Sequence, residues 1–228
     1  MRMKISEPID ELMNGGIENE CVNNFYGPSA TGKTNIALEA LVACVNQNKK
    51  CIFIDTEGSF SAERLKQLTG ETEKYTNNTI LLEPKTWKEQ IQTFNKLSEI
   101  DAGLIIVDSI VALWRITITN ENAPETIREL GTQLSLLSKI AREKRIPVII
   151  TNQVYSDIET GKTEMSAKNI IKWWSKNIIE LKHAGRTSQR IARIVKARSL
   201  PEDKKILFKI TESGLKTEHG YDYTTSNL

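Results

Sequence analysis

Short apolar runs alternate with longer amphipathic runs along most of the chain. The apolar runs cover residues 22–26, 51–55, 79–83, 104–108 and 147–151. The helix-like runs extend from Lys33 to about Asn46, from near Ser61 onward, from Thr86 to about Ile100 and from Pro124 to about Arg145. Strands that are apolar throughout, without polar alternation, are typical of a parallel sheet covered on both faces. The pattern therefore predicts an α/β fold whose mostly parallel central sheet is flanked by helices.

The pattern changes after residue 177. The segments NIIELKH (177–183), RIARIVKA (190–197) and ILFKITESGLK (206–216) resemble strands joined by short turns such as Glu212-Ser213-Gly214. Such runs predict C-terminal antiparallel strands that extend the sheet. A chain of 228 residues with 39% hydrophobic residues can bury one core. We expect a single domain over residues 1–228, with an N-terminal segment (1–20) and a polar, disordered tail (220–228).

Composition limits the partners and the cellular compartment that can be expected for the protein. The net charge is +2, so a nucleic-acid surface would have to be a local patch. The chain lacks the run of about 18 apolar residues that a membrane helix needs, and its start, MRMKISEPID, does not resemble a signal peptide. Cys21, Cys44 and Cys51 have no paired spacing and are expected to be reduced core residues. A cytoplasmic protein without a membrane partner is predicted.

Residues 27–34, GPSATGKT, match the phosphate-binding pattern G-x-x-x-x-G-K-[ST] between a predicted strand and a predicted helix. Gly27 and Gly32 allow the backbone to wrap closely, so that its N–H groups face a polyphosphate at a helix N-terminus. Lys33 supplies a point charge to the phosphates, and the Thr34 hydroxyl is a ligand for Mg²⁺. The predicted nucleotide contacts are Gly27, Pro28, Ser29, Ala30, Thr31, Gly32, Lys33 and Thr34. The cofactors expected are ATP and Mg²⁺.

Polar residues at the ends of three other strands complete a candidate site. Asp108 ends the strand LIIVD and is predicted to order the metal ion, the alternative being a helix cap. Asp55 ends the strand CIFID and Glu57 follows it, and Glu57 is the better placed of the two to polarise a water molecule. The alternative for Glu57 is an exposed loop acid. Gln153, after the strand PVIIT, suits sensing of a γ-phosphate through its neutral amide.

Several segments together resemble the RecA-fold recombinases and, within them, the archaeal RadB proteins. They are LMNGGIE (12–18), FYGPSATGKT (25–34), FIDTEGSFSAERL (53–65), LIIVDSI (104–110), TNQV (151–154) and residues 190–215. The resemblance implies a RecA-like ATPase core in which Glu57 activates water, Gln153 senses the γ-phosphate and Asp108 orders the metal ion. It further implies that Arg64 stacks on adenine, which suits a planar guanidinium. The alternative for Arg64 is an ordinary solvated helix face.

A basic run separates Glu180 from Glu202, with no acid between them. The residues predicted to contact DNA phosphates are Lys182, His183, Arg186, Arg190 and Arg193, and Lys196 and Arg198 add charge to the same run. The stretch KHAGR (182–186) resembles a basic motif that is linked to DNA binding in RadB proteins. The alternative is a solvated rim that maintains solubility. Of the adjacent Trp173 and Trp174, one is expected in the core, and stacking on bases or contact with a partner protein is open for the other.

Departures from the recombinase pattern shape the functional expectation. The chain begins shortly before the phosphate loop, so the N-terminal DNA-binding domain and the polymerisation motif of RadA are expected to be absent. The segments that correspond to recombinase DNA loops, residues 114–126 and 154–169, are of mixed charge and do not form a strong cationic groove. These departures favour a regulator of recombination with weak, DNA-independent ATP hydrolysis.

The expected partners follow from the same resemblance. They are single-stranded DNA bound with low sequence specificity, a recombinase of the RadA type and recombination nucleases, and a homodimer is left open. A nucleoid-associated location in the cytoplasm is implied. Three alternatives remain at this point: an ATPase that exchanges strands itself, a RecA-fold signalling ATPase and a small-molecule phosphotransferase.

Overall fold

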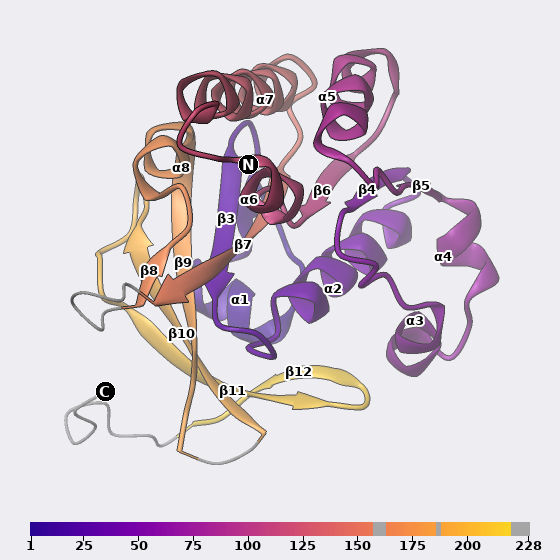
Figure 1. Cartoon of the computed structure of the whole chain (residues 1–228). Helices are drawn as coiled ribbons and strands as arrows, with labels where there is room; N and C mark the ends of the chain where they lie inside the picture. The colour runs from indigo at the N-terminus through magenta and orange to yellow at the C-terminus, as the bar shows by residue number, and fades with distance from the viewer. Residues whose placement is uncertain (157–162, 186–187, 220–228) are drawn as a thin grey trace.

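The five apolar runs form five neighbouring strands of one sheet in the computed structural model, which describes residues 1–156, 163–185 and 188–219. The strands are β3 (Val22–Gly27), β4 (Cys51–Asp55), β5 (Thr79–Leu82), β6 (Leu104–Asp108) and β7 (Val148–Ser156). Their spatial order is β5-β4-β6-β7-β3, and each neighbouring pair is parallel (Figure 1). The predicted parallel sheet is confirmed. Its carboxyl edge gathers the ends of β3, β4, β6 and β7.

Four further strands continue the sheet beyond β3. They are β9 (Ser175–His183), β10 (Gln189–Lys196), β11 (Lys205–Thr211) and β12 (Gly214–Thr217). The antiparallel arrangement is confirmed for the β9–β10, β10–β11 and β11–β12 pairs. β9 itself runs parallel to β3, which the sequence analysis did not predict. The helix α8 (Lys168–Trp174) returns the chain toward the start of β3, so β9 leaves in the same direction as β3.

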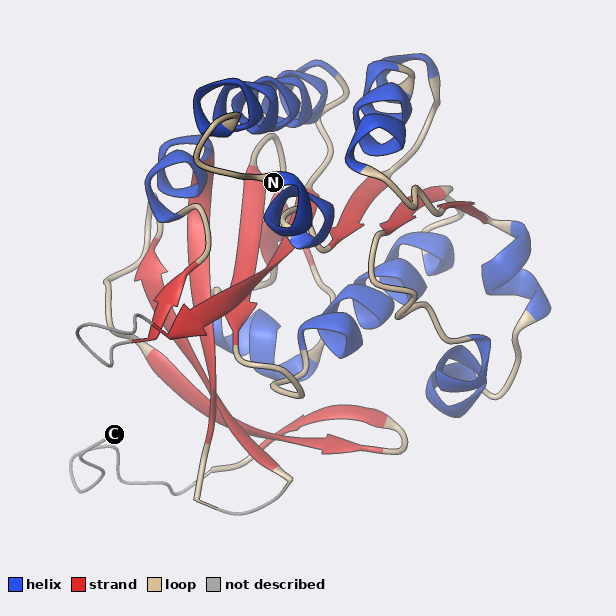
Figure 2. Ribbon diagram, in the orientation of Figure 1, coloured by secondary structure: helices blue, strands red, loops and turns tan. Residues whose placement is uncertain are grey.

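Helices cover both faces of the sheet (Figure 2). One face carries α1 (Glu7–Leu12), α2 (Lys33–Asn46), α3 (Ala62–Thr69) and α4 (Glu73–Asn77). The other carries α5 (Trp87–Asn95), α6 (Ala112–Thr117), α7 (Ala123–Glu143) and α8. The predicted helix over residues 86–100 ends early, since α5 stops at Asn95 and a 3₁₀ turn, Leu97–Glu99, follows. The short strands β1 (Arg2–Met3) and β2 (Ile17–Glu18) form a separate pair, and β8 (Thr163–Met165) pairs with β7.

The core consists of two layers, one on each face of the sheet. Successive residues of β4 point to opposite faces, so Phe53 packs with α2 in one layer while Ile52 and Ile54 pack in the other. All five residues of β4 are buried, as the uniformly apolar run requires. Such complete burial leaves the carboxyl ends of the strands as the place where polar side chains can meet solvent.

The three cysteines are buried and unpaired, which confirms their role as core residues. Burial raises the pKa of the Cys21 thiol to about 12 and that of Cys44 to about 11, so both stay protonated and unreactive.

Within the described ranges, none of the helices combines the length and the apolar character needed to cross a membrane. The polar tail (220–228) and Arg186, about which the sequence made predictions, lie outside the described residues.

Candidate nucleotide site

The phosphate-loop segment connects β3 to α2 at the carboxyl edge of the sheet (Figure 1). Gly27 has to be a glycine because a Cβ there would lie 2.2 Å from the carbonyl oxygen of Leu181 on β9. Gly32 is the N-cap of α2 and has a φ of 100°, a left-handed conformation that side chains disfavour. The first backbone bond of the helix runs from Ile36 N to Gly32 O, so the N–H groups of residues 33–35 do not donate within the helix. The loop therefore has the backbone geometry of an anion cradle.

Lys33 lies folded over this loop. Its ammonium donates to the carbonyl oxygens of Gly27 at 3.0 Å and Pro28 at 2.8 Å, and the residue is 9% exposed. Burial lowers the pKa of Lys33, whereas the carboxylates of Asp108 and Glu57 raise it. The ammonium is thus a buried cation on the inner side of the loop, where it can bind a phosphate group.

Asp108 is the centre of a cluster of hydroxyl groups. Its Oδ2 accepts hydrogen bonds from Thr34 Oγ1 at 2.7 Å and Ser59 Oγ at 2.9 Å, and its Oδ1 accepts one from Thr151 Oγ1. The cap alternative is wrong, because α6 has Val111 as its N-cap. Thr34 and Asp108 present adjacent oxygen atoms of the kind that Mg²⁺ prefers, so these residues fit the expected metal ion. Sequence reasoning missed Ser59, in the loop after β4, and Thr151, within β7.

Asp55 has a structural role that the sequence did not reveal. It is 2% exposed, and its Oδ1 accepts from the backbone N–H groups of Glu57, Gly58 and Ser59, at 3.0, 2.8 and 3.1 Å. Its Oδ2 accepts from Phe60 N at 2.8 Å. Asp55 therefore folds the loop after β4 around its own carboxylate and fixes the backbone of Glu57.

Glu57 is exposed but not isolated. Its Oε1 accepts a hydrogen bond from Gln153 Nε2 at 2.7 Å, and Gln153 Oε1 accepts one from Arg115 at 2.8 Å. The loop after β4, the strand β7 and the helix α6 thus meet through three side chains. The predicted proximity of Glu57 and Gln153 is confirmed, and Arg115 is a third member that the sequence analysis did not assign to the nucleotide site.

Arg64 is held by several acceptors. Its guanidinium donates to Asn35 Oδ1 at 2.7 Å, to the carbonyl oxygens of Thr211 at 2.8 Å and Glu212 at 2.9 Å, and to Gln67. The alternative of an ordinary solvated helix face is therefore wrong. Arg64 joins α3 to α2 and to the turn between β11 and β12. Stacking on adenine stays a prediction.

The cations of the basic run are less available to DNA than the sequence indicates. Arg193 lies directly opposite Glu180 in the β9–β10 ladder and donates to it at 2.8 Å, and it also pairs with Asp203 at 2.7 Å. Lys182 lies 3.7 Å from the same Glu180. The acids at or just beyond the two ends of the run therefore fold back onto its cations. Sequence spacing could not show this, because strand register sets the pairing.

Two other members of the run contact the phosphate loop. His183 Nε2 lies 3.0 Å from the carbonyl oxygen of Ser29, and Arg190 Nε donates to the carbonyl oxygen of Ala30 at 2.9 Å. DNA binding by Lys182, His183, Arg190 and Arg193 stays a prediction, and Arg186 lies outside the described residues.

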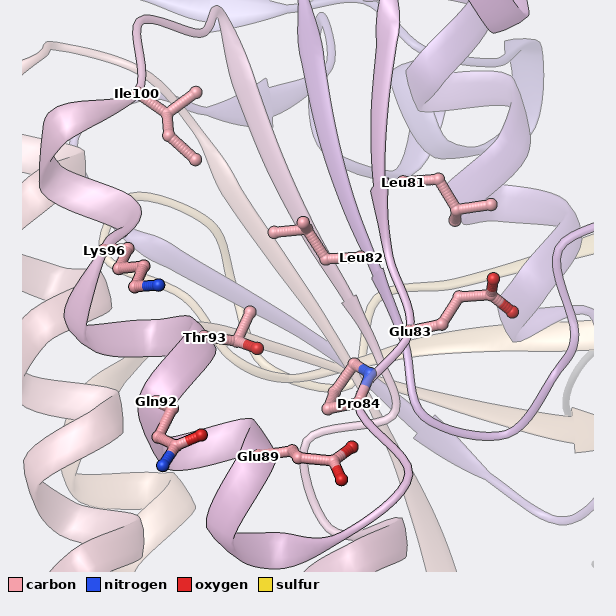
Figure 3. Close-up of a pocket in the computed structure, with 9 residues that line it drawn as sticks. All are labelled: Leu81, Leu82, Glu83, Pro84, Glu89, Gln92, Thr93, Lys96 and Ile100. Atoms are coloured by element: carbon pink, nitrogen blue, oxygen red, sulfur yellow. The ribbon is translucent and has the colours of Figure 1, made fainter.

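The described residues also line hollows away from this edge. Near the start of β9, a cavity of about 350 Å³ is lined by Glu20, Ser138, Arg142, Trp173, Trp174, Lys176 and Arg198. Trp174 is half-buried and packs against the core, as expected for one of the pair, whereas Trp173 is 76% exposed. A second cavity, of about 420 Å³, lies between β5 and α5, where Thr93 and Lys96 face Leu82 (Figure 3). None of the predicted catalytic or nucleotide-binding residues lines either hollow.

Comparison with known proteins gives one consistent result. The Rad51 family model matches residues 3–218. The chain is similar to the DNA repair and recombination protein RadB of Methanococcoides burtonii, with 41% identity over 92% of this chain and 95% of that protein. RadB of Methanobrevibacter smithii is 36% identical over 91% of this chain and 92% of that protein. A crystal structure of the RadB recombinase superimposes with a TM-score of 0.80 at 32% identity, covering 93% of this chain and 98% of that one.

Proposed function

This chain belongs to the Rad51 family and, within it, to the RadB proteins, and from that membership we propose that it is an ATP- and DNA-binding protein of recombination and repair. In this proposal it hydrolyses ATP slowly and uses the nucleotide as a conformational switch. It assists the main recombinase and does not exchange strands itself.

The observation that carries ATP binding is the convergence of four segments at one edge of the sheet. Lys33 and Thr34 come from the phosphate loop, Asp108 from β6, Glu57 from the loop after β4 and Gln153 from β7. The bonds Thr34–Asp108 and Glu57–Gln153, both at 2.7 Å, join them in pairs. An anion cradle, a buried cation, a pair of metal-type oxygen ligands and an exposed carboxylate are the groups that phosphoryl transfer to water needs.

Each residue then has a separate task. Lys33 binds phosphate oxygens, and Thr34 with Asp108 would hold Mg²⁺, which when bound supplies positive charge against the phosphates. Glu57 accepts a proton from the attacking water, while Asp55 keeps the backbone of Glu57 in place. Gln153 senses the γ-phosphate because its amide already bridges Glu57 and Arg115. A change at Gln153 is passed through Arg115 to α6, which gives the switch a physical path.

The regulatory role is supported by the segments that follow β6 and β7. In the described parts of these segments, Arg115 in the first is bonded to Gln153, and Lys168 in the second is paired with Glu164 at 2.8 Å. Residues 157–162 of the second segment lie outside the described residues. Cations engaged in this way neutralise few DNA phosphates, so we expect DNA to stimulate hydrolysis weakly. Single-stranded DNA bound through Lys182 and its neighbours, a RadA-type recombinase, recombination nucleases and a second copy of the chain are the proposed partners.

The experiment compares ATP affinity in the parent, Lys33→Ala and Lys88→Ala, the last being an exposed lysine on α5. With Mg²⁺ and a fluorescent ATP analogue, we expect Lys33→Ala to lose affinity by roughly 100-fold, since a charge-assisted phosphate contact is lost, and Lys88→Ala to match the parent. Equal affinity in all three proteins would refute the site. Stimulation of hydrolysis by single-stranded DNA of more than about tenfold, or roughly 1.4 kcal/mol, would instead support the strand-exchanging alternative.

A further inference from the structure

The hairpin of β9 and β10 touches the phosphate loop at three successive places. The carbonyl oxygen of Leu181 packs against Gly27, His183 bonds to the carbonyl oxygen of Ser29, and Arg190 bonds to that of Ala30. A carbonyl oxygen only accepts, so Nε2 of His183 carries the proton in its bond to Ser29. The loop is therefore held by hydrogen bonds from His183 and Arg190, which lie outside the phosphate-binding motif. The sequence had predicted that both residues contact DNA.

These two bonds determine where loop N–H groups point. In a trans peptide unit the carbonyl of one residue and the N–H of the next point in opposite directions. Holding the Ser29 carbonyl on the hairpin side turns the N–H of Ala30 away from the hairpin, and holding the Ala30 carbonyl does the same for Thr31. The outward carbonyls thus aim the amides of Ala30 and Thr31 toward the interior of the cradle.

The conformation at Ala30 needs such support. Its φ is 60°, in the left-handed region, which costs an alanine roughly 1–2 kcal/mol. Residues hold such conformations when the surrounding structure over-determines them. Arg190 suits this task because it is 8% exposed, and a guanidinium taken out of water requires acceptors at fixed positions. Besides Ala30 it donates to the carbonyl oxygen of Gln189 at 2.8 Å, which fixes its plane.

We propose that Arg190 is a positioning residue of the phosphate loop, supported by His183, and that the pair sets the affinity for ATP by orienting the amides of Ala30 and Thr31. The inference rests on the proposed ATP binding. Amides that contact the phosphates stabilise the bound substrate and the transition state alike, so their misplacement weakens binding more than it slows the chemical step.

The test measures ATP affinity and single-turnover hydrolysis at saturating ATP in Arg190→Ala, Arg190→Lys and His183→Ala, with Arg198→Ala as the matched control. Arg198 is an exposed arginine just beyond the far end of β10. We expect Arg190→Ala to weaken ATP binding by roughly tenfold or more and His183→Ala by roughly threefold, as the loss of a charged and a neutral hydrogen bond implies. The single-turnover rate should change by less than about twofold.

Two readouts separate positioning from a general structural role. Arg190→Lys keeps a donor for Ala30 and should recover most of the affinity, and guanidinium ion added at low millimolar concentration should raise the ATP affinity of Arg190→Ala but not of the parent. Parent-like affinity in a folded Arg190→Ala variant would overturn the proposal. If that variant does not fold, His183→Ala decides, because its exposed side chain can be removed without disturbing the core, and unchanged affinity would then overturn it. Failure of the parent to bind ATP would instead refute the proposed function.

Discussion

The two ends of the β9–β10 ladder both carry cations, but they use them differently. At the end beside the phosphate loop, His183 and Arg190 bond to loop carbonyls, and further along the ladder Arg193 pairs with Glu180. At the other end, Lys196 donates to the carbonyl oxygens of Lys172 and Ser175. Lys176 and Arg198 lie there around the exposed Trp173, and among the described residues no carboxylate comes within salt-bridge distance of either. A count of charges along the run does not distinguish the two ends, because cross-strand register decides which charges are already satisfied.

The difference teaches that engaged polar groups and open ones should respond to substitution in different ways. An engaged group holds its neighbours in place, so its removal alters nucleotide binding, catalysis or folding. An open cation contributes mainly to the long-range field, so its removal alters salt-dependent binding. Substitutions of engaged and of open cations therefore test this difference.

The largest effect is expected at Glu57. Glu57→Gln keeps an oxygen that can accept from Gln153 but removes the carboxylate that accepts a proton from water. Single-turnover hydrolysis should fall by roughly 100-fold or more while ATP affinity stays within about twofold of the parent. The control is Glu83→Gln, an exposed acid that directly follows the neighbouring strand β5. Equal turnover in the two variants would exclude Glu57 as the proton acceptor.

A second prediction concerns Glu39 of the phosphate-loop helix α2. Burial raises the pKa of this carboxyl group to about 7 from its ordinary value of 4.5, although the N–H of Leu215 donates to it and lowers the pKa. The folded protein thus binds the proton more tightly than the unfolded chain. The protonated Glu39 therefore adds to the free energy of unfolding at acidic pH. This contribution, at most on the order of 3 kcal/mol, is lost as the pH rises from 4.5 through 7.

Glu39→Gln removes this titration and keeps an acceptor for Leu215. Its melting temperature should equal that of the parent near pH 4.5 and exceed it at pH 8, whereas Glu63→Gln, an exposed acid on α3, should follow the parent at both. A constant difference across this range would show that Glu39 does not titrate with folding.

A matched pair of arginines tests the comparison directly. Arg193→Ala leaves the Glu180 carboxylate, whose side chain is 14% exposed, with Lys182 at 3.7 Å as its remaining cation, and should destabilise the fold by about 1–3 kcal/mol. Arg198→Ala removes an open cation and should change stability by less than about 0.5 kcal/mol. Denaturant titration of both variants measures the difference. Equal losses would mean that the engaged and the open arginine do not differ in kind.

The sequence predicted the fold well because its signals are local. Predominantly apolar runs identified β3, β4, β6 and β7, and the glycines and lysine of residues 27–34 located the phosphate loop, since both depend on residues close together in the chain. The parallel direction of β9 was not predictable, because it depends on how α8 returns the chain.

In the candidate site, too, some contacts between side chains were predictable from the sequence and others were not. At the carboxyl edge of the sheet, Glu57 meets Gln153 and Asp108 meets Thr34, as expected. The bonds of Thr151 and Ser59 to Asp108, and of Arg190 to Ala30, join residues 43 to 160 positions apart and depend on register and loop conformation. Charge composition was least informative, since Glu180 and Asp203 lie outside the acid-free run that they neutralise.

The smallest predicted effect is at Lys182. Its ammonium lies 3.7 Å from Glu180 and its side chain is 45% exposed, so it is only loosely engaged and can turn toward a DNA phosphate. Lys182→Ala should flatten the dependence of log affinity for single-stranded DNA on log salt by roughly 0.7, the share of one phosphate contact, and leave ATP affinity unchanged. Arg198→Ala, measured in the same titration, reports on the opposite end of the ladder. A slope that changes only in Arg198→Ala would move the DNA surface to the hollow beside Trp173, where the cations are open and an exposed ring is available for stacking on a base.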